Sequence, residues 1–344
     1  MEHTTIAVDL AKSVFQVGVS HRPGRVDEER RLSRDRLLKF FAQQPPATVF
    51  LEACGSAHHW ARQLQPFGHT VRLLPAHDVR PYVRRNKTDR TDAKGLLEAN
   101  RNEEIQPVPV KTIGYQAIAS LHRLRSTWLA TRTARLNTLR GLLREFGIFI
   151  PTGAQHVVPR VRALAGDPAD VPLVLHTTLA VACDEIEGLE ANIRAVERQL
   201  AALASEMAEV ALLQTVPGVG VLTATALVAL LTDIRRFPSG RHFASFLGLT
   251  PKEDSSGSRR RIGAISKQGD VYVRMLLTHG ARSVVWHAKA ATHPTPLQQW
   301  ARQTEQRRGH NVAAVAVANK LARIAWAVWV QRRPFAPDYR APSS

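Results

Sequence analysis

Hydrophobic positions in the first 110 residues alternate between short β-branched runs and amphipathic stretches. Residues 4–20 hold two apolar runs with a turn between them, and residues 26–33 can supply a third strand. After this β-meander come DRLLKFFAQQ, a helix closed by two prolines, and ATVFLEACG, a compact apolar strand. A helix over 57–67 and a strand in HTVRLLPA follow. The pattern predicts a mixed α/β sheet covered by helices.

The pattern becomes helical after residue 112. Leucines recur at helical spacing from residue 115 to 146 with arginines between them, which predicts one long amphipathic helix with a cationic face. A solvated face would show the same pattern, so contact with nucleic acid is one of two interpretations. Residues 151–176 are rich in Pro and Gly, and we interpret them as a linker or hinge. The arginines proposed for nucleic-acid contact are Arg123, Arg132 and Arg135.

A narrow apolar seam follows this linker. Its members recur at alternating spacings of three and four residues, the a/d pattern of a coiled coil. Burial against another helix of the same chain is one explanation, but the narrowness of the stripe favours self-association between copies. The seam residues are Ile186, Leu189, Ile193, Val196, Leu200, Leu203, Met207 and Val210.

Two further features predict the organisation of the C-terminal part. Residues 212–231 place Pro-Gly-Val-Gly between two apolar helical runs, as in a helix-hairpin-helix. Gly218 and Gly220 would then leave backbone N–H groups for a DNA phosphate, although a simple interhelical turn is also possible. Residues 270–330 are helical and Trp-rich, and a Pro-rich tail follows. We therefore divide the chain into residues 1–112, 113–211, 212–334 and 335–344.

Composition points to a polyanionic partner. The chain has 47 Lys and Arg against 29 Asp and Glu, a net charge of +18. Neutralising phosphates releases counterions, so such a charge favours binding to nucleic acid. Cys54 and Cys183 are the only cysteines and show no CxxC spacing, which fits a reducing cytoplasm. We expect no export signal and no membrane span.

Four acidic residues are candidates for a metal site. Asp9 and Glu52 each follow an apolar run, so both can lie at strand ends on one edge of a sheet. Asp89 and Asp92 are three residues apart, just after Lys87, and share one face if a helix begins there. Carboxylates suit Mg²⁺ or Mn²⁺ rather than zinc, and paired metals assist phosphoryl transfer. Helix capping or pairing with a buried arginine would explain each acid singly.

A serine-rich segment at residues 247–269 is the candidate nucleophilic site. It contains Ser255, Ser256 and Ser258 around Gly257. A serine beside a flexible glycine can approach a phosphodiester closely, and neighbouring guanidinium groups can stabilise the developing charge. The alternative is a flexible loop that only binds phosphate. The cations that follow are Arg259, Arg260, Arg261 and Lys267.

These motifs together resemble the DEDD-type transposases of the insertion-sequence-110 family. The resemblance runs in family order through IAVDLAKSVFQV, VFLEACGS, RNKTDRTDAKGL, PGVG, RHFASFLGLTPKEDSSGS and ISKQGDVYVRMLL. It implies a RuvC-like, ribonuclease H-like N-terminal domain, a helical coiled-coil insertion and a helical C-terminal transposase domain. It also implies that Asp9, Glu52, Asp89 and Asp92 are the four acids. Ser256, or Ser255 if the motif is shifted by one residue, would be the nucleophile.

The resemblance further implies how the protein acts. Ser256 would attack a DNA phosphate with Mg²⁺ assistance, so that strand cleavage and exchange insert and excise the element. The protein would be a cytoplasmic bacterial dimer or tetramer that is guided by a structured bridge RNA, with acids and serine drawn from different protomers. Two rival interpretations remain: a RuvC-like junction nuclease without covalent serine chemistry, and a non-catalytic nucleic-acid-binding protein.

Overall fold

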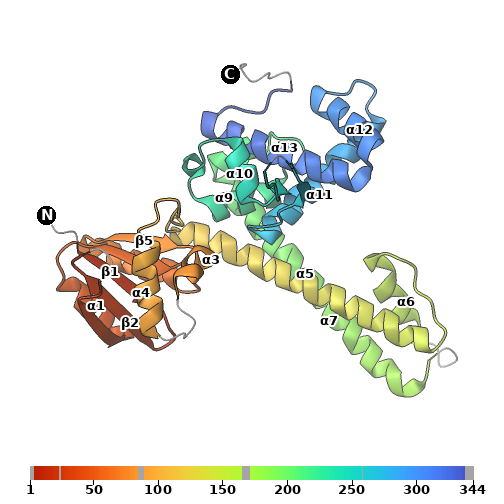
Figure 1. Ribbon diagram of the computed structural model, residues 1–344. Coiled ribbons are helices and arrows are strands. Elements are labelled where there is room, and N and C mark those ends of the chain that lie inside the picture. Colours follow the sequence, from red (N-terminus) through yellow and green to blue (C-terminus); the bar gives the residue numbers. More distant parts are fainter. Residues whose placement is uncertain (1–3, 23–24, 84–88, 165–170, 258, 338–344) are drawn as a thin grey trace. The chain divides into compact units, whose positions relative to one another are not determined.

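The computed structural model describes residues 4–22, 25–83, 89–164, 171–257 and 259–337, with the backbone alone for residues 89–91. The chain divides into two compact units, which we call the N-terminal unit, Met1–Thr112, and the C-terminal unit, Ile113–Ser344 (Figure 1).

The N-terminal unit is built on a five-stranded sheet in the order β3-β2-β1-β4-β5. The first three strands pair antiparallel as a meander, whereas β1, β4 and β5 are parallel neighbours. The predicted mixed sheet is therefore confirmed, and its order is compatible with a ribonuclease H-like domain. The elements are β1 (Thr5–Asp9), β2 (Val14–Ser20), β3 (Glu28–Ser33), α1 (Arg34–Ala42), β4 (Thr48–Glu52), α2 (Ala57–Leu64), β5 (Thr70–Leu74), α3 (Ala76–Val79) and α4 (Asp89–Ala99).

Helices cover both faces of this sheet. Successive side chains of a strand point to opposite faces, so each strand contributes to two separate cores. Val8 and Leu51 belong to the cluster that α1 and α2 close, together with Trp60. Ala7 and Phe50 belong to the opposite cluster, which α4 closes. Asp9 and Glu52 follow Ala7 and Phe50 by two residues and therefore belong to this second face.

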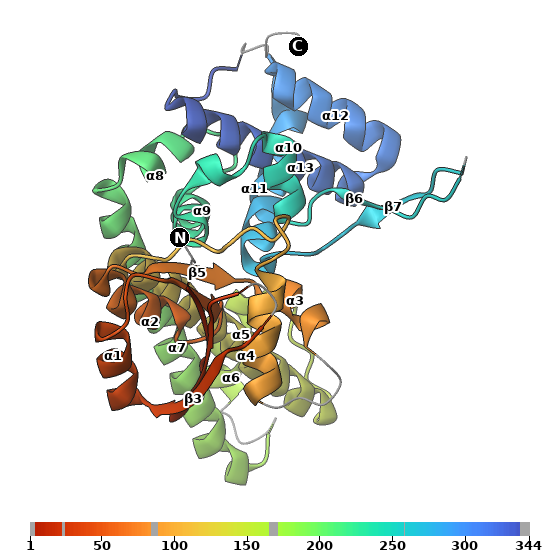
Figure 2. The same cartoon turned by 60° about the vertical axis from the view of Figure 1, so that its left-hand side comes forward.

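The C-terminal unit is mostly helical. Two long helices pack side by side and carry a short helix at one end, and the remaining helices form a bundle at the other end (Figure 1). A two-stranded hairpin extends from this bundle (Figure 2). The elements are α5 (Ile113–Glu145), α6 (Val157–Leu164), α7 (Leu173–Ser205), α8 (Ala208–Leu213), α9 (Val221–Leu231), α10 (Gly240–Phe246), β6 (Pro251–Glu253), β7 (Ile262–Ile265), α11 (Val271–Ala290), α12 (Pro296–Arg308) and α13 (His310–Gln331).

The apolar seam of α7 packs inside the chain. Ile186, Ile193 and Leu200 are buried, and α5 supplies the opposite side of the contact. The alternative of burial against another helix of the same chain is therefore what the structure shows, because Ile118, Leu136 and related residues of α5 supply the partner stripe. The reason for expecting self-association through this seam therefore falls away.

The segment interpreted as a linker contains a packed helix. Val157, Val161 and Leu164 of α6 are buried against the α5–α7 pair. The Arg162 guanidinium also lies 2.6 Å from the carboxylate of Asp184 and 2.7 Å from that of Glu187. Proline and glycine end the flanking helices here without preventing a short helix between them.

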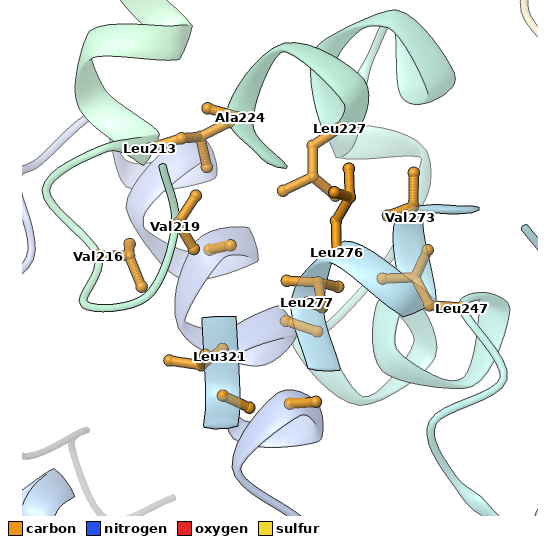
Figure 3. Packing of buried hydrophobic residues seen from close by; sticks show 14 of the residues in the cluster. Leu213, Val216, Val219, Ala224, Leu227, Leu247, Val273, Leu276, Leu277 and Leu321 are labelled. Carbon is orange, nitrogen blue, oxygen red and sulfur yellow. The ribbon is translucent and has the colours of Figure 1, made fainter. Parts of the chain in front are cut away.

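The main core of the C-terminal unit lies among α8, α9, α10, α11 and α13. Leu213, Val219 and Leu227 meet Leu277 and Leu321 there (Figure 3). By length and composition alone α13 could cross a membrane, but half of its apolar stretch is buried inside the unit. Burial in a helical core explains its apolar composition.

Candidate carboxylate site and serine hairpin

Asp9 and Glu52 lie at the carboxyl ends of neighbouring strands. Asp9 is the last residue of β1 and Glu52 the last of β4. The two strands are parallel, with Val8 opposite Leu51, so the acids come one position later on both. Asp9 comes two residues after Ala7, and Glu52 comes two residues after Phe50, so each acid points to the same sheet face as that apolar residue. Ala7 and Phe50 lie under α4. The two half-buried carboxylates therefore share the face that α4 covers.

The other two acids belong to α4. Asp89 is its first residue and Asp92 follows one turn later, half-buried. Ala93, next in the chain, is buried against the sheet, with its Cβ 3.7 Å from the position of a Cβ built on Gly18 of β2. The start of the helix thus lies over the sheet face that carries Asp9 and Glu52. Lys87 and the Asp89 side chain lie outside the described residues.

The donor chemistry fits a hard cation, although the full ligand set does not assemble among the described side chains. Carboxylate oxygens are the ligands that Mg²⁺ and Mn²⁺ prefer. Within the described part of the chain, no three His, Cys, Asp or Glu side chains gather closely enough to hold a metal ion. Asp9 and Glu52 could hold a cation only with help from α4.

The serine segment is an exposed β-hairpin. β6 and β7 pair antiparallel, and Ser256 forms a bridge with Arg259 beyond them. The Ser256 N–H donates to the Arg259 carbonyl at 3.2 Å, and the Arg259 N–H donates back at 3.1 Å. Gly257 has φ +56°, a left-handed conformation that suits glycine in a hairpin turn. Ser256 is exposed at this turn.

The two adjacent serines differ in their contacts. The Ser255 hydroxyl donates to the Glu253 carboxylate at 3.0 Å and accepts from the Arg261 N–H at 3.2 Å. It therefore holds the two sides of the hairpin together. The Ser256 hydroxyl makes no hydrogen bond with any described residue. Ser258 lies outside the described residues.

The cations of the hairpin are mostly open to solvent. Arg260 donates to the Glu253 carboxylate at 3.1 Å. Arg259 and Arg261 are exposed, and neither forms an ion pair with a described carboxylate. Lys267 lies in the loop after β7, with φ +56°, and its N–H donates to the Gly248 carbonyl at 3.1 Å.

Two of the three arginines chosen on α5 are engaged with α7. Arg132 lies 3.5 Å from the Glu190 carboxylate, and Arg135 lies 2.8 Å from that of Glu185. Opposite charges across two packed helices explain these arginines without a nucleic acid. Arg123 is exposed and forms no ion pair with a described carboxylate.

The glycines of the PGVG turn also differ. Gly218 has φ +77°, and a Cβ there would lie 2.6 Å from the carbonyl oxygen of Gly280 in α11. Close packing of two backbones therefore explains this glycine. Gly220 is the exposed N-cap of α9, and a Cβ there would meet open space. The exposure of Gly220 leaves room for a phosphate at this helix start.

Positive charge concentrates near the C-terminus, which the helix-by-helix prediction missed. Residues 234–344 carry 19 Lys and Arg against 5 Asp and Glu, a net charge of +14. Residues 113–233, which include the helix expected to be cationic, carry 10 against 11. Counting acids together with bases over each segment would have found this. α11 and α13 contain no acidic residue at all.

Comparison with known proteins shows the family. The sequence pattern described as "Transposase IS116/IS110/IS902 family" matches residues 210–295, and a DEDD transposase pattern of the same family matches residues 6–148. The chain is 42% identical to a probable family 20 transposase of Pseudomonas aeruginosa, over 98% of this chain and all of that protein. It is 34% identical to the transposase for insertion sequence element IS1111A of Coxiella burnetii, over 96% and 90% of the two chains.

The N-terminal unit contains a mixed sheet that carries acidic residues, and the helical C-terminal unit is strongly basic. Together with these relatives, the two features define a DNA transposase of the DEDD class. The chain belongs to the IS116/IS110/IS902 family of transposases. It also resembles a pilin gene-inverting protein of Moraxella lacunata, at 32% identity over 36% of this chain and 38% of that protein.

Proposed function

We propose that this transposase cuts and rejoins DNA by transesterification at Ser256, with Asp9, Glu52, Asp89 and Asp92 holding Mg²⁺ or Mn²⁺. The observation that carries the proposal is the exposed hairpin turn. It presents one serine hydroxyl, free of hydrogen bonds to described residues, across the turn from Arg259, and neither Arg259 nor Arg261 forms an ion pair with a described carboxylate. Ser255 is engaged within the hairpin, which favours Ser256 as the nucleophile.

The chemistry at the turn balances without an external reactant. The Ser256 hydroxyl oxygen attacks the phosphorus, and its proton passes to a general base. One bridging P–O bond breaks, and the leaving oxygen takes up a proton. Because the phosphoserine diester keeps the energy of the broken bond, a second DNA end can attack it and release the serine. Arg259 and Arg261 would stabilise the charge on the phosphate oxygens.

The acids of the N-terminal unit supply the metal site in this proposal. Strand alternation places Asp9 and Glu52 on the sheet face beneath α4, and the helix would add Asp89 and Asp92. A bound divalent cation would lower the pKa of an attacking oxygen and neutralise the leaving oxygen. The carboxylates themselves orient that cation and can accept a proton.

The covalent step is tested by trapping. The protein is incubated with Mg²⁺, the RNA that copurifies with it and end-labelled element DNA, then denatured and examined for label on the protein. We expect label on the parent and none on Ser256→Ala, because the nucleophile is lost. Ser255→Ala serves as the matched control and should retain label, although with a weaker hairpin.

Each other outcome overturns part of the proposal. Label that survives Ser256→Ala and disappears in Ser255→Ala would move the nucleophile by one residue. Cleavage that continues in Ser256→Ala without covalent label would favour the junction-nuclease alternative. Absence of label on the parent under conditions that support recombination would exclude serine attack.

Substitution of the strand-end acids tests the metal site. Asp9→Asn and Glu52→Gln keep the shape of each side chain but remove its charge, so we expect recombination to fall at least about a hundredfold, as for lost metal-site groups. Chelation of divalent cations should have the same effect. Glu98→Gln, an acid in the last turn of α4, is the matched control. Parental recombination by both strand-end variants, with unchanged folding by circular dichroism, would reject the assignment.

We also propose a structured guide RNA and a homo-oligomer as partners. The net charge of +14 over residues 234–344 supports binding to nucleic acid. Sequencing of copurified RNA tests this: a single noncoding species encoded beside the gene is expected, whereas a heterogeneous mixture would argue against a guide. An oligomer would have to use surfaces other than the α7 seam, which α5 covers.

A further inference from the structure

A large pocket lies at the base of the serine hairpin. Its volume is about 800 Å³, within the range of roughly 300–1,000 Å³ typical of ligand sites. Gly263, Ala264 and Ile265 of strand β7 line it together with Val312 and Val315 of α13. Trp300 of α12 also belongs to the lining. The lining is therefore largely apolar, which suits the faces of a planar ring.

The lining carries two cations and no acid. Lys320 and Arg323 are three residues apart on α13, and both line the pocket. The Lys320 ammonium lies 4.3 Å from the centroid of the Trp300 ring. Neither cation forms an ion pair with a carboxylate in the described part of the chain. Burial, followed by repulsion from Arg323, lowers the pKa of Lys320.

Lys320 is half-buried beside apolar residues, with the exposed Arg323 next to it and no described carboxylate paired with either. Taking a charge out of water costs free energy unless an opposite charge is close, and neighbouring like charges add to that cost. Such a pair is therefore expected where an anion binds. The Asn311 amide, also in the lining and exposed, adds hydrogen-bond donors and an acceptor. An anion joined to a planar, hydrogen-bonding ring matches these features.

We propose that this pocket binds one unpaired DNA nucleotide, with the base between β7 and α13 and its phosphate at Lys320 and Arg323. Aromatic and apolar walls cover the faces of extruded bases, and amides read their edges. The occupant is DNA because the chain is a DNA transposase. From the Pro251–Ile265 pair to Ser256 the hairpin extends by five residues, roughly 17 Å, so the nucleotide lies several positions from the proposed attack point.

Binding of three probes to the full-length protein tests the proposal. The probes are a twelve-base thymidine oligonucleotide, the same backbone with every base removed, and the uridine RNA of equal length. Because stacking of one base strengthens binding roughly five- to 150-fold, we expect the thymidine probe to bind at least about fivefold more tightly than the abasic probe. The pocket does not depend on serine attack, so Ser256→Ala should retain this ratio.

Two substitutions test whether the preference for the thymidine probe over the abasic probe arises in this pocket. Ala316→Phe fills the pocket without changing charge and should bring the ratio of the two DNA affinities close to one. Lys320→Met should weaken both DNA probes by more than Arg307→Met, which removes the same charge from an exposed position on α12 outside the pocket. A ratio unchanged in a folded Ala316→Phe variant would reject the proposal.

Photo-crosslinking keeps the proposal testable if a variant fails to fold. Thymidine oligonucleotides that carry one 5-iododeoxyuridine should crosslink to the parent protein at peptides of β7, α12 or α13. Crosslinks confined to other segments would reject base binding in this pocket. If the uridine probe bound more tightly than the thymidine probe, and Ala316→Phe removed that difference, the occupant of the pocket would be RNA and not DNA.

Discussion

One buried histidine shows how a single side chain joins several helices. The His122 ring on α5 is 4% exposed. One nitrogen lies 3.0 Å from the Tyr272 hydroxyl on α11 and the other 2.9 Å from the Thr225 hydroxyl on α9. Burial, and then the positive charge of Arg125, lower the pKa of His122 to about 4. The histidine is therefore neutral in the folded protein at neutral pH.

This neutrality makes stability depend on pH. Between pH 6.5, its ordinary pKa, and about 4, its folded value, the unfolded state binds the proton and the folded state does not. Stability contributed by His122 is thus present above pH 6.5 and falls as the pH drops toward 4. We expect the loss to reach about 3 kcal/mol in the free energy of unfolding.

The measurement compares urea unfolding of the parent and of His122→Gln, at about pH 7 and about pH 4.5. Glutamine keeps a hydrogen-bonding amide but does not titrate, so the variant should lose less stability on acidification. Burial and nearby cations also lower the pKa of His58 to about 4, but this histidine is common to both proteins and cancels in the comparison. Equal acid sensitivity of the two proteins would contradict the prediction.

At the scale of elements, the α5–α7 pair is an antiparallel hairpin closed by apolar and ionic contacts. Arg125, Arg132 and Arg135 along α5 meet Glu197, Glu190 and Glu185 along α7, so residue numbers rise on one helix as they fall on the other. The pairs near the surface each contribute little. The buried seam between them supplies most of the stability.

This packing predicts the outcome of placing a charge in the seam. Ile193 is a buried position of the α7 seam, so Ile193→Asp should lower the free energy of unfolding by roughly 3–5 kcal/mol, the cost of an unpaired buried charge. Ala191→Asp adds the same charge at an exposed position of α7 and should lower the free energy of unfolding by only about 1 kcal/mol, the loss of helix propensity and repulsion from nearby acids. Urea unfolding and analytical ultracentrifugation check both. A well-folded Ile193→Asp variant that only dissociates from an oligomer would show that the seam is intermolecular.

Over the whole molecule, charge is segregated along the chain. Residues 1–112 carry a net charge of +5, residues 113–233 carry −1 and residues 234–344 carry +14. Each phosphate that a cation neutralises changes the slope of log affinity against log salt by about 0.9. DNA binding should therefore respond to cations of the last segment and not to those paired on α5.

We expect Arg259→Gln with Arg261→Gln to make that slope less negative by about 1.8 for duplex DNA of arbitrary sequence. Arg132→Gln with Arg135→Gln removes the same charge from the α5–α7 contact and should leave the slope unchanged. Fluorescence anisotropy over a range of potassium chloride concentrations measures both. If the slope changed for the Arg132 and Arg135 variant and not for the Arg259 and Arg261 variant, the nucleic-acid surface would lie on α5.

The sequence by itself determined the mixed sheet, the long helices and the edge of the sheet where two acids lie. Apolar runs that stop at Asp9 and Glu52 mark the ends of buried strands, because burial demands a local pattern of side chains. That pattern is visible within a few residues. The exposed serine turn was also predictable, since Gly257 and its polar neighbours favour a hairpin.

Only the tertiary structure decided what those elements meet. The α7 seam looks the same whether its partner is α5 or another copy, and Arg135 looks the same whether it faces a phosphate or Glu185. Gly218 serves close packing against Gly280, 62 residues away in the sequence. Local patterns state which face is buried or charged. The identity of the partner depends on contacts between distant segments, which only the folded chain brings together.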